Sequence, residues 1–160
     1  MIFLLGLFIS LSSFAETSFD LSGMWLRSGA TSDERPLQFI LINKQYHYHG
    51  TERFIFEDGR PSHTIEQNVK LSRVSEDVLE GSVDFFDSRG CSFKGLPVKA
   101  QFMNENTVNV LMTVPRYKHV TVTRSRDGDR YYPHRRVIIS SHTECRLLEH
   151  VEVPVQLLRM

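Results

Sequence analysis

The chain has 160 residues, with 19 Lys and Arg against 19 Asp and Glu, and only 2 Cys. Its length fits one domain with one hydrophobic core. A composition of 41% apolar and 24% charged residues is typical of a globular protein rather than a disordered one. The balanced charge argues against a polycation that binds nucleic acid, and two cysteines are too few for a disulfide-framed miniprotein.

Residues 1–11 form an apolar run that is too short for the roughly 20 residues needed to span a bilayer. Ser13 and Ala15 place small residues where a signal peptidase cleaves after Ala15. We therefore expect a signal peptide at 1–15 and a single β-barrel domain at 16–160. The mature protein would be exported, to the periplasm or outside the cell, and would not span the membrane after cleavage. A buried strand or a membrane anchor is the alternative, because no Lys or Arg precedes the apolar run.

From residue 20 onward, apolar and polar residues alternate with the period of β-strands. The alternating segments lie at 20–25, 64–72, 79–85, 98–102, 108–114, 120–122 and 151–157. Sequences that favour turns occur at 43–44, 57–59, 88–90, 104–106 and 127–128. One apolar and one polar face per strand is typical of antiparallel sheets. We predict an all-β fold, a single antiparallel up-and-down β-barrel of about eight to ten short strands, with a β-sandwich as the alternative.

Residues at the two ends of this pattern favour a closed barrel. Gly23 and Trp25 form a Gly-x-Trp on the first expected strand, and Arg159 continues the inward-facing series of the last one. The first and last strands of a barrel are neighbours, so Trp25 and Arg159 would meet there, with the guanidinium stacked over the indole. The alternative for Arg159 is a solvated position at the chain end.

The Gly-x-Trp and the last-strand arginine resemble those of the calycin barrels, the lipocalin- and avidin-like proteins. The resemblance covers Gly23, Trp25 and Arg159, and the Thr-Asp-Tyr loop motif of lipocalins is absent. It implies a cup-shaped barrel that holds a small apolar or amphipathic ligand without catalysis. The ligand-binding candidates are then Trp25, Arg159 and the aromatic residues whose parity directs them inward. These aromatic residues are Phe39, Tyr46, Tyr48, Phe54, Phe56, Phe85 and Phe102. Alternatively, these aromatic side chains simply fill the core.

The sequence predicts no enzyme, no cofactor and no metal site. His47 and His49 come nearest to a metal motif, but their parity is opposite to that of Tyr46 and Tyr48 and places them on the outward face. No phosphate-binding or dinucleotide-binding loop is present, and no Gly-x-Ser-x-Gly elbow surrounds a serine.

The two cysteines are expected to pair. Cys91 and Cys145 would form a disulfide in an oxidising compartment, and two buried thiols are the alternative. A thiol redox role is not predicted, because no Cys-x-x-Cys motif places a second thiol nearby.

Charge is unevenly distributed along the chain. Residues 116–136 carry seven basic side chains against two acidic ones, whereas residues 52–89 carry nine acidic against five basic. The basic candidates for an anionic contact are Arg116, Lys118, Arg124, Arg126, Arg130, Arg135 and Arg136. They support a second hypothesis, an inhibitor or envelope adaptor whose surface binds an anionic envelope component or a protein, with nucleic acid excluded by export. A solvated hairpin with cross-strand ion pairs is the alternative.

Overall fold

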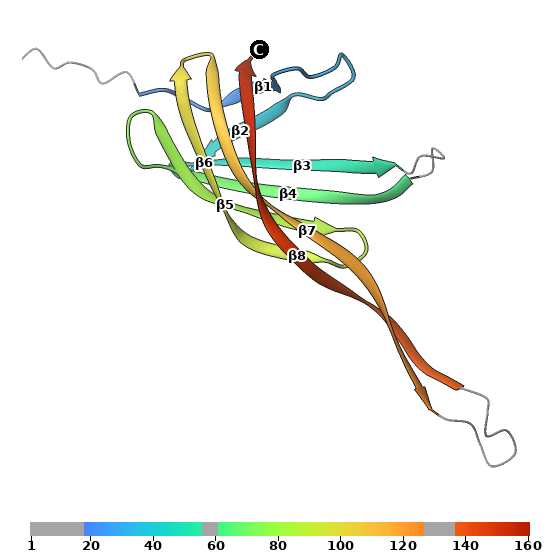
Figure 1. Ribbon diagram of the computed structural model, residues 1–160. Helices are drawn as coiled ribbons and strands as arrows, with labels where there is room; N and C mark the ends of the chain where they lie inside the picture. The colour runs from blue at the N-terminus through green and yellow to red at the C-terminus, as the bar shows by residue number, and fades with distance from the viewer. Residues whose placement is uncertain (1–17, 56–60, 127–136) are drawn as a thin grey trace, which may run out of the picture.

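The computed structural model describes residues 18–55, 61–126 and 137–160, with side chains for 18–51, 64–125, 138 and 140–160. Eight strands follow one another around a single antiparallel sheet, and the last strand returns to pair with the first (Figure 1). They are β1 (Gly23–Arg27), β2 (Leu37–Ile42), β3 (Gln45–Ile55), β4 (Pro61–Arg73), β5 (Val78–Asp87), β6 (Ser92–Asn104), β7 (Thr107–Arg126) and β8 (Val137–Arg159). The predicted all-β, up-and-down barrel is therefore confirmed, and the sandwich alternative is not formed. None of the described residues belongs to a helix that could cross a membrane.

The turns follow the local sequence. Three of the predicted turns, at 43–44, 88–90 and 104–106, join consecutive strands. Asn43 and Lys44 both have positive φ, 49° and 66°, as the type I′ turn of a two-residue hairpin requires. The turns expected at 57–59 and 127–128 lie outside the described residues, as does the expected signal peptide.

The apolar faces of the strands meet inside the barrel, with the parity that the sequence predicted. On β5, for example, Leu79, Val83 and Phe85 are buried while Glu80 points outward and is exposed. Gly81 interrupts this inward series because the neighbouring strand comes too close for a side chain: a Cβ there would lie 1.8 Å from the carbonyl oxygen of Lys70.

One end of the barrel is closed by the residues that precede β1. The ring of Phe19 stacks on that of Phe102 with 5.2 Å between centroids, and Leu21 is fully buried. The indole Nε1 of Trp25 donates a hydrogen bond of 2.8 Å to the carbonyl oxygen of Leu21. Arg73, at the end of β4, donates to the carbonyl oxygen of Phe19. These contacts hold residues 19–25 as a plug over this end of the core.

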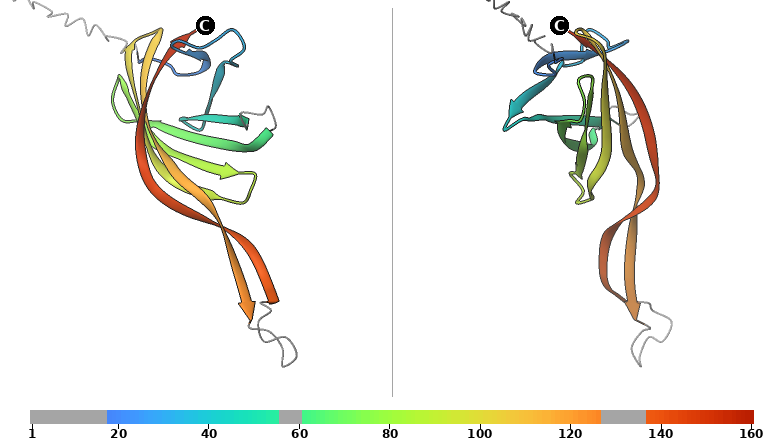
Figure 2. Two further views of the ribbon diagram at one scale, coloured as in Figure 1. Left: turned by 45° about the vertical axis from the view of Figure 1, so that its right-hand side comes forward. Right: turned by 90° about the vertical axis from the view of Figure 1, so that its left-hand side faces the viewer.

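The last two strands continue far beyond the barrel as a two-stranded ribbon (Figures 1 and 2). β6 pairs with β7 only as far as Met112, and β1 pairs with β8 only from Leu157 onward. The β7–β8 ladder nevertheless continues to its last pair, Arg126 with Val137. Pro97 lies next to Val98, the last β6 residue of the β6–β7 ladder, and has no backbone N–H to donate to a further pair.

This ribbon differs from the short strands that the sequence predicted. The segments at 108–114 and 120–122 belong to one strand of 20 residues. The ladder has an irregularity between Arg116 and Tyr117. The extra residue of this bulge, Leu148, is on β8, so it does not shift the period of β7. On β7 the even-numbered apolar series is interrupted by Arg116 and Lys118, so the alternation in the sequence stops although the strand continues.

Candidate functional site

The barrel interior is mostly filled by the aromatic side chains that the sequence placed there. Trp25, Phe39, Tyr46, Phe85 and Phe102 are buried, with 0 to 5% of their surface exposed, and Tyr48 is half-buried. The side chain of Phe54 and all of Phe56 lie outside the described part of the structure. Burial of these residues fits a packed core as well as a binding site, so their role in ligand binding stays a prediction.

A small cavity remains inside the barrel, away from the plugged end. Its volume is about 70 Å³, it is partly open, and most of its wall is apolar. Leu37, Phe39, Val98 and Met112 contribute to the wall, with Arg27, Tyr48 and Gln67 as polar groups. Sites for drug-sized ligands measure about 300–1,000 Å³. This cavity therefore fits only a few heavy atoms unless the side chains around it move.

Arg159 and Trp25 form the contact that the sequence predicted. The guanidinium carbon lies 4.7 Å from the centroid of the indole ring, and the two residues are paired between β8 and β1. Arg159 Nε also donates to the carbonyl oxygen of Glu105 over 3.1 Å, and its Nη2 donates to that of Asp20. Arg159 is thus part of the outer cover of the plugged end rather than of the cavity wall.

A second cluster lies where the ribbon leaves the barrel, around the buried carboxylate of Asp87. Asp87 Oδ2 accepts a hydrogen bond of 2.6 Å from the hydroxyl of Tyr117 and lies 3.0 Å from Nε2 of His119. Its Oδ1 accepts a bond of 2.7 Å from the backbone N–H of Arg89. The cluster connects the end of β5 to the face of β7 that carries Tyr117 and His119. It braces the base of the ribbon against the barrel.

Burial and the neighbouring carboxylate change the acid–base behaviour of Tyr117. Burial disfavours the phenolate and raises the pKa of Tyr117 well above its ordinary value of 10.0. The hydrogen bond to Asp87 and the repulsion between the two anions raise this pKa further, while Arg89 lowers it slightly. Tyr117 is therefore a permanent hydrogen-bond donor at physiological pH and not a proton-transfer group.

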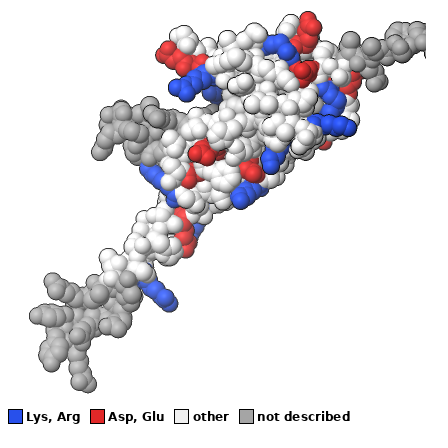
Figure 3. Space-filling model, turned by 180° about the vertical axis from the view of Figure 1, so that it is seen from behind, with Lys and Arg blue, Asp and Glu red and all other residues white. Residues whose placement is uncertain are grey.

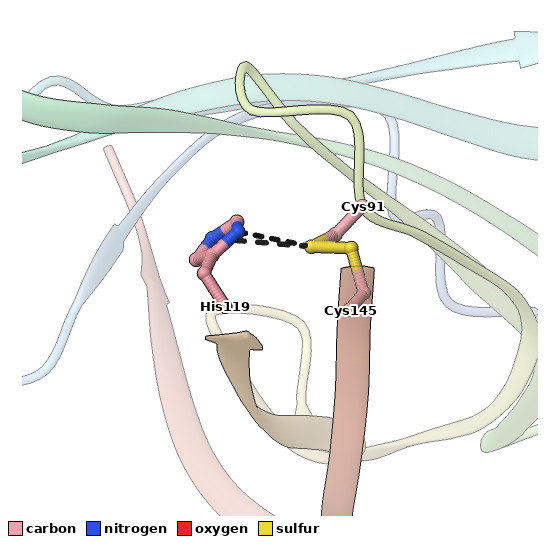
Figure 4. A group of neighbouring side chains, drawn as sticks. All are labelled: Cys91, His119 and Cys145. Carbon is pink, nitrogen blue, oxygen red and sulfur yellow. Dashed lines mark hydrogen bonds between the residues drawn. A yellow bond between two sulfur atoms is a disulfide. The ribbon is translucent and has the colours of Figure 1, made fainter. Parts of the chain in front are cut away.

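The predicted disulfide is present next to this cluster. Cys91, in the turn between β5 and β6, is bonded to Cys145 on β8. His119 and Cys145 are paired across the β7–β8 ladder, so their side chains share one face of the ribbon. The imidazole faces the sulfur of Cys91, with 3.6 Å from Nδ1 and 3.9 Å from Nε2 (Figure 4). Since both sulfurs are in the disulfide, this Cys–His–Cys group offers no thiolate to a metal ion in the oxidised protein.

The ribbon beyond this base carries basic and apolar side chains on exposed backbone. Residues 116–126 and 137–149 hold five basic residues against two acidic ones. Lys118, Arg124 and Arg146 are exposed, and Arg116 forms an ion pair of 2.7 Å with Glu149. Ile138 is 65% exposed. On the barrel, by contrast, acidic and basic side chains lie side by side (Figure 3).

Not all of the basic candidates can be placed. The side chain of Arg126 and all of Arg130, Arg135 and Arg136 lie outside the described residues. Of the basic residues that the structure describes, Lys118 and Arg124 are both even-numbered positions of β7, whereas His119 is an odd-numbered one. Their side chains therefore lie on the same side of the ribbon, opposite that of His119.

His47 and His49 lie on β3, as predicted, with parity opposite to the buried Tyr46. His49 is exposed, and its Nδ1 is 2.6 Å from the side-chain oxygen of Asn68. Within the described side chains, the one group with metal-ligand spacing is that of Cys91, His119 and Cys145, which includes neither of them.

Sequence reasoning missed Asp87, Tyr117 and His119 as a unit. They come from two strands that are not neighbours in the barrel, and none of their spacings along the chain marks them. The available clue was the cysteine pair, because linking the 88–90 turn to the hairpin places residues beside Cys145 next to residues beside Cys91.

The chain was also compared with known proteins. No protein-family model, curated protein or solved structure matches it. The site must therefore be interpreted from its own chemistry.

Proposed function

We propose that this protein is a non-enzymatic binding protein, exported to an oxidising compartment, that uses the β7–β8 ribbon to hold an extended acidic segment of a partner protein. The observation that carries the proposal is the free edge of the ribbon. From Thr113 to Arg126, no other strand in the described residues pairs with β7 except β8. Such an edge presents unpaired backbone N–H and C=O groups, which can add a strand from a partner.

The side chains of the ribbon indicate the kind of strand that would be added. The excess of basic residues favours a segment rich in Asp and Glu. Pro115 and Pro154 lie near the barrel, so they leave the edges unblocked beyond Tyr117 and Leu147. An isolated two-stranded ribbon is at best marginally stable in water, and a third strand would stabilise it.

Direct binding of a designed peptide tests this proposal. The peptide would alternate Thr and Glu, and a second version would carry N-methyl groups on alternate backbone nitrogens of the pairing edge. We expect the unmodified peptide to bind with an affinity that falls as salt rises, and the methylated peptide not to bind, because it cannot complete the ladder. Equal binding of both peptides would show simple charge attraction and contradict strand addition.

Charge variants locate the binding surface. Lys118→Glu combined with Arg124→Glu should weaken peptide binding by about tenfold or more, since two attractive contacts become repulsive. Lys70→Glu combined with Lys99→Glu, which reverses two exposed charges on the barrel, is the matched control and should have little effect. Equal loss in both variants would assign the binding to overall charge. Vesicles of anionic lipid and heparin, tested with the same variants, show whether a non-protein polyanion is the better partner.

A second candidate function is supported by the apolar cavity. The Gly-x-Trp and Arg159 resemblance to calycin barrels, together with this cavity, favours a carrier of a small apolar or amphipathic molecule. Native mass spectrometry of protein from its own compartment should then show an added mass that the denatured protein lacks. Met112→Trp fills the cavity and should abolish the added mass, while Leu111→Trp, whose side chain points outward, should not. A bare native mass for the wild-type protein would leave the ribbon as the functional surface.

A further inference from the structure

The disulfide at the base of the ribbon differs from a purely structural cross-link because a histidine and a buried carboxylate lie beside it. We propose that the Cys91–Cys145 disulfide exchanges with an external small-molecule thiol, that the thiol attacks Cys145, and that His119 is the general acid that protonates the departing sulfur of Cys91. This activity does not depend on what the ribbon or the barrel binds.

The two sulfurs belong to residues of very different exposure. Cys91 is 2% exposed, whereas Cys145 lies on the ribbon and is exposed. A thiolate in solution therefore approaches Cys145. In-line attack on that sulfur makes Cys91 the leaving group, and the rate of exchange rises when the leaving sulfur is stabilised.

Cys91 is poorly placed to leave as an anion without help. It is buried, and burial of an unpaired charge in a protein is costly. His119 Nδ1 is 3.6 Å from the Cys91 sulfur, which is within reach for proton donation. The imidazole is itself only partly exposed and is directed at this sulfur from β7 (Figure 4).

Asp87 positions the imidazole for proton donation to Cys91. Its Oδ2 lies 3.0 Å from His119 Nε2, so the carboxylate accepts a hydrogen bond from Nε2 and holds the ring with Nδ1 3.6 Å from the sulfur of Cys91. Tyr117 and the backbone N–H of Arg89 hold the carboxylate in place. Among the described residues, the groups placed against His119 or its carboxylate partner include Asp87 from β5, Tyr117 from β7, the backbone of Arg89 and the disulfide itself. Asp87 acts through His119 and is a positioning residue.

The exchange step balances without any other reactant. The thiolate forms a bond to the sulfur of Cys145, the bond between the two protein sulfurs breaks, and its electron pair goes to the sulfur of Cys91. Nδ1 of His119 gives that sulfur a proton. The products are a mixed disulfide at Cys145, a neutral thiol at Cys91 and a neutral imidazole, which regains its proton from water.

The test is a timed reaction of the folded, oxidised protein with 2-mercaptoethanol, stopped with acid. Free thiols are then alkylated at low pH with N-ethylmaleimide, and peptide masses identify the modified cysteines. We expect the adduct on Cys145 and alkylation on Cys91. His119→Gln should react about 100-fold more slowly, which is the lower end of the range typical for the loss of a general acid.

Two further variants separate catalysis from structure. His142→Gln is the matched control, because His142 is an exposed histidine on the same ribbon, 2.8 Å from a Glu144 oxygen. It should react as the wild type does. Asp87→Asn should slow the exchange and change its pH profile. If His119 only braced the ribbon, its removal would loosen the base and speed the reaction, which is the opposite sign.

Three results would overturn the proposal. The first is an adduct on Cys91 instead of Cys145, and the second is equal or faster reaction of His119→Gln. The third is a rate that rises steeply with low concentrations of urea, as it does when only unfolded molecules react. A rate that is insensitive to low urea is expected.

Discussion

Arg159 on the last strand covers Trp25 on the first, with its guanidinium carbon 4.7 Å from the centroid of the indole ring. The indole is fully buried, while Arg159 as a residue is exposed. The arginine thus separates the tryptophan from water and donates to the carbonyl oxygens of Glu105 and Asp20 around it. This pair joins the strands that close the barrel.

Trp25 should therefore be the most costly aromatic side chain to remove at this end. We expect Trp25→Ala to lower the free energy of unfolding by about 3–5 kcal/mol, because a fully buried large side chain is replaced by a cavity. Denaturant unfolding followed by far-UV circular dichroism measures this loss. Unchanged stability would show that the plug does not hold the barrel closed.

The stacking of Arg159 on Trp25 has a contribution of its own, which a double-mutant cycle isolates. With Trp25→Leu and Arg159→Gln, the coupling energy should be about 1 kcal/mol, between the values for exposed and desolvated cation–π pairs. Trp25→Leu with Lys99→Gln is the control cycle, since Lys99 is exposed on β6 and pairs with Glu80. The control coupling should be near zero.

Two glycines should respond differently to the same substitution. Gly81→Ala is expected to be strongly destabilising, because its Cβ would lie 1.8 Å from the backbone oxygen of Lys70, which moves only with the strand. Gly50→Ala should cost less. The atom in its way is the hydroxyl oxygen of Tyr48, at 1.9 Å, and that side chain can rotate aside. Chemical unfolding of both variants tests the order, and a larger cost at Gly50 would contradict it.

The raised pKa of Tyr117 predicts a loss of stability in alkali. Below the ordinary tyrosine pKa of 10.0 the folded and unfolded states both hold the proton, so the stabilisation is complete. Above it the unfolded state loses the proton first, and the free energy of unfolding falls, by at most about 1.4 kcal/mol per pH unit for one group. Urea unfolding from pH 8 to 11 measures this fall.

Tyr117→Phe is the control for that measurement. It should lower stability at pH 8, because Asp87 loses a hydrogen bond, and it should flatten the fall above pH 10. An equally steep fall in the variant would assign the alkaline loss to other groups.

Removing the disulfide should loosen both barrel and ribbon. Cys91→Ser combined with Cys145→Ser is expected to lower the free energy of unfolding by about 4 kcal/mol, the chain-entropy value for a loop of this size. Trypsin should also cut the ribbon faster, since Lys118 and Arg146 flank the lost link. Unchanged proteolysis would show that the Asp87 cluster alone braces the base.

The sequence was most informative where a simple physical rule applied along the whole strand. Alternation predicted the inward faces of β5 and β8, and the opposition of first and last strands predicted the contact between Trp25 and Arg159. Arg116 and Lys118 interrupt the apolar series of β7, so the length of this strand was missed. Asp87, Tyr117 and His119 could not be joined beforehand, because their proximity depends on the path of a twisted ribbon and not on any spacing in the chain.

The link between Cys91 and Cys145 also determines how force would travel through the molecule. A pull on the outer end of β8 reaches Cys145 first, and the covalent bond passes that pull to the turn between β5 and β6. The part of β8 that closes the barrel, from Arg146 to Arg159, follows Cys145 in the chain and is therefore shielded from the pulling force. A partner that pulls on the ribbon would therefore separate the outer parts of β7 and β8, while the barrel keeps its shape.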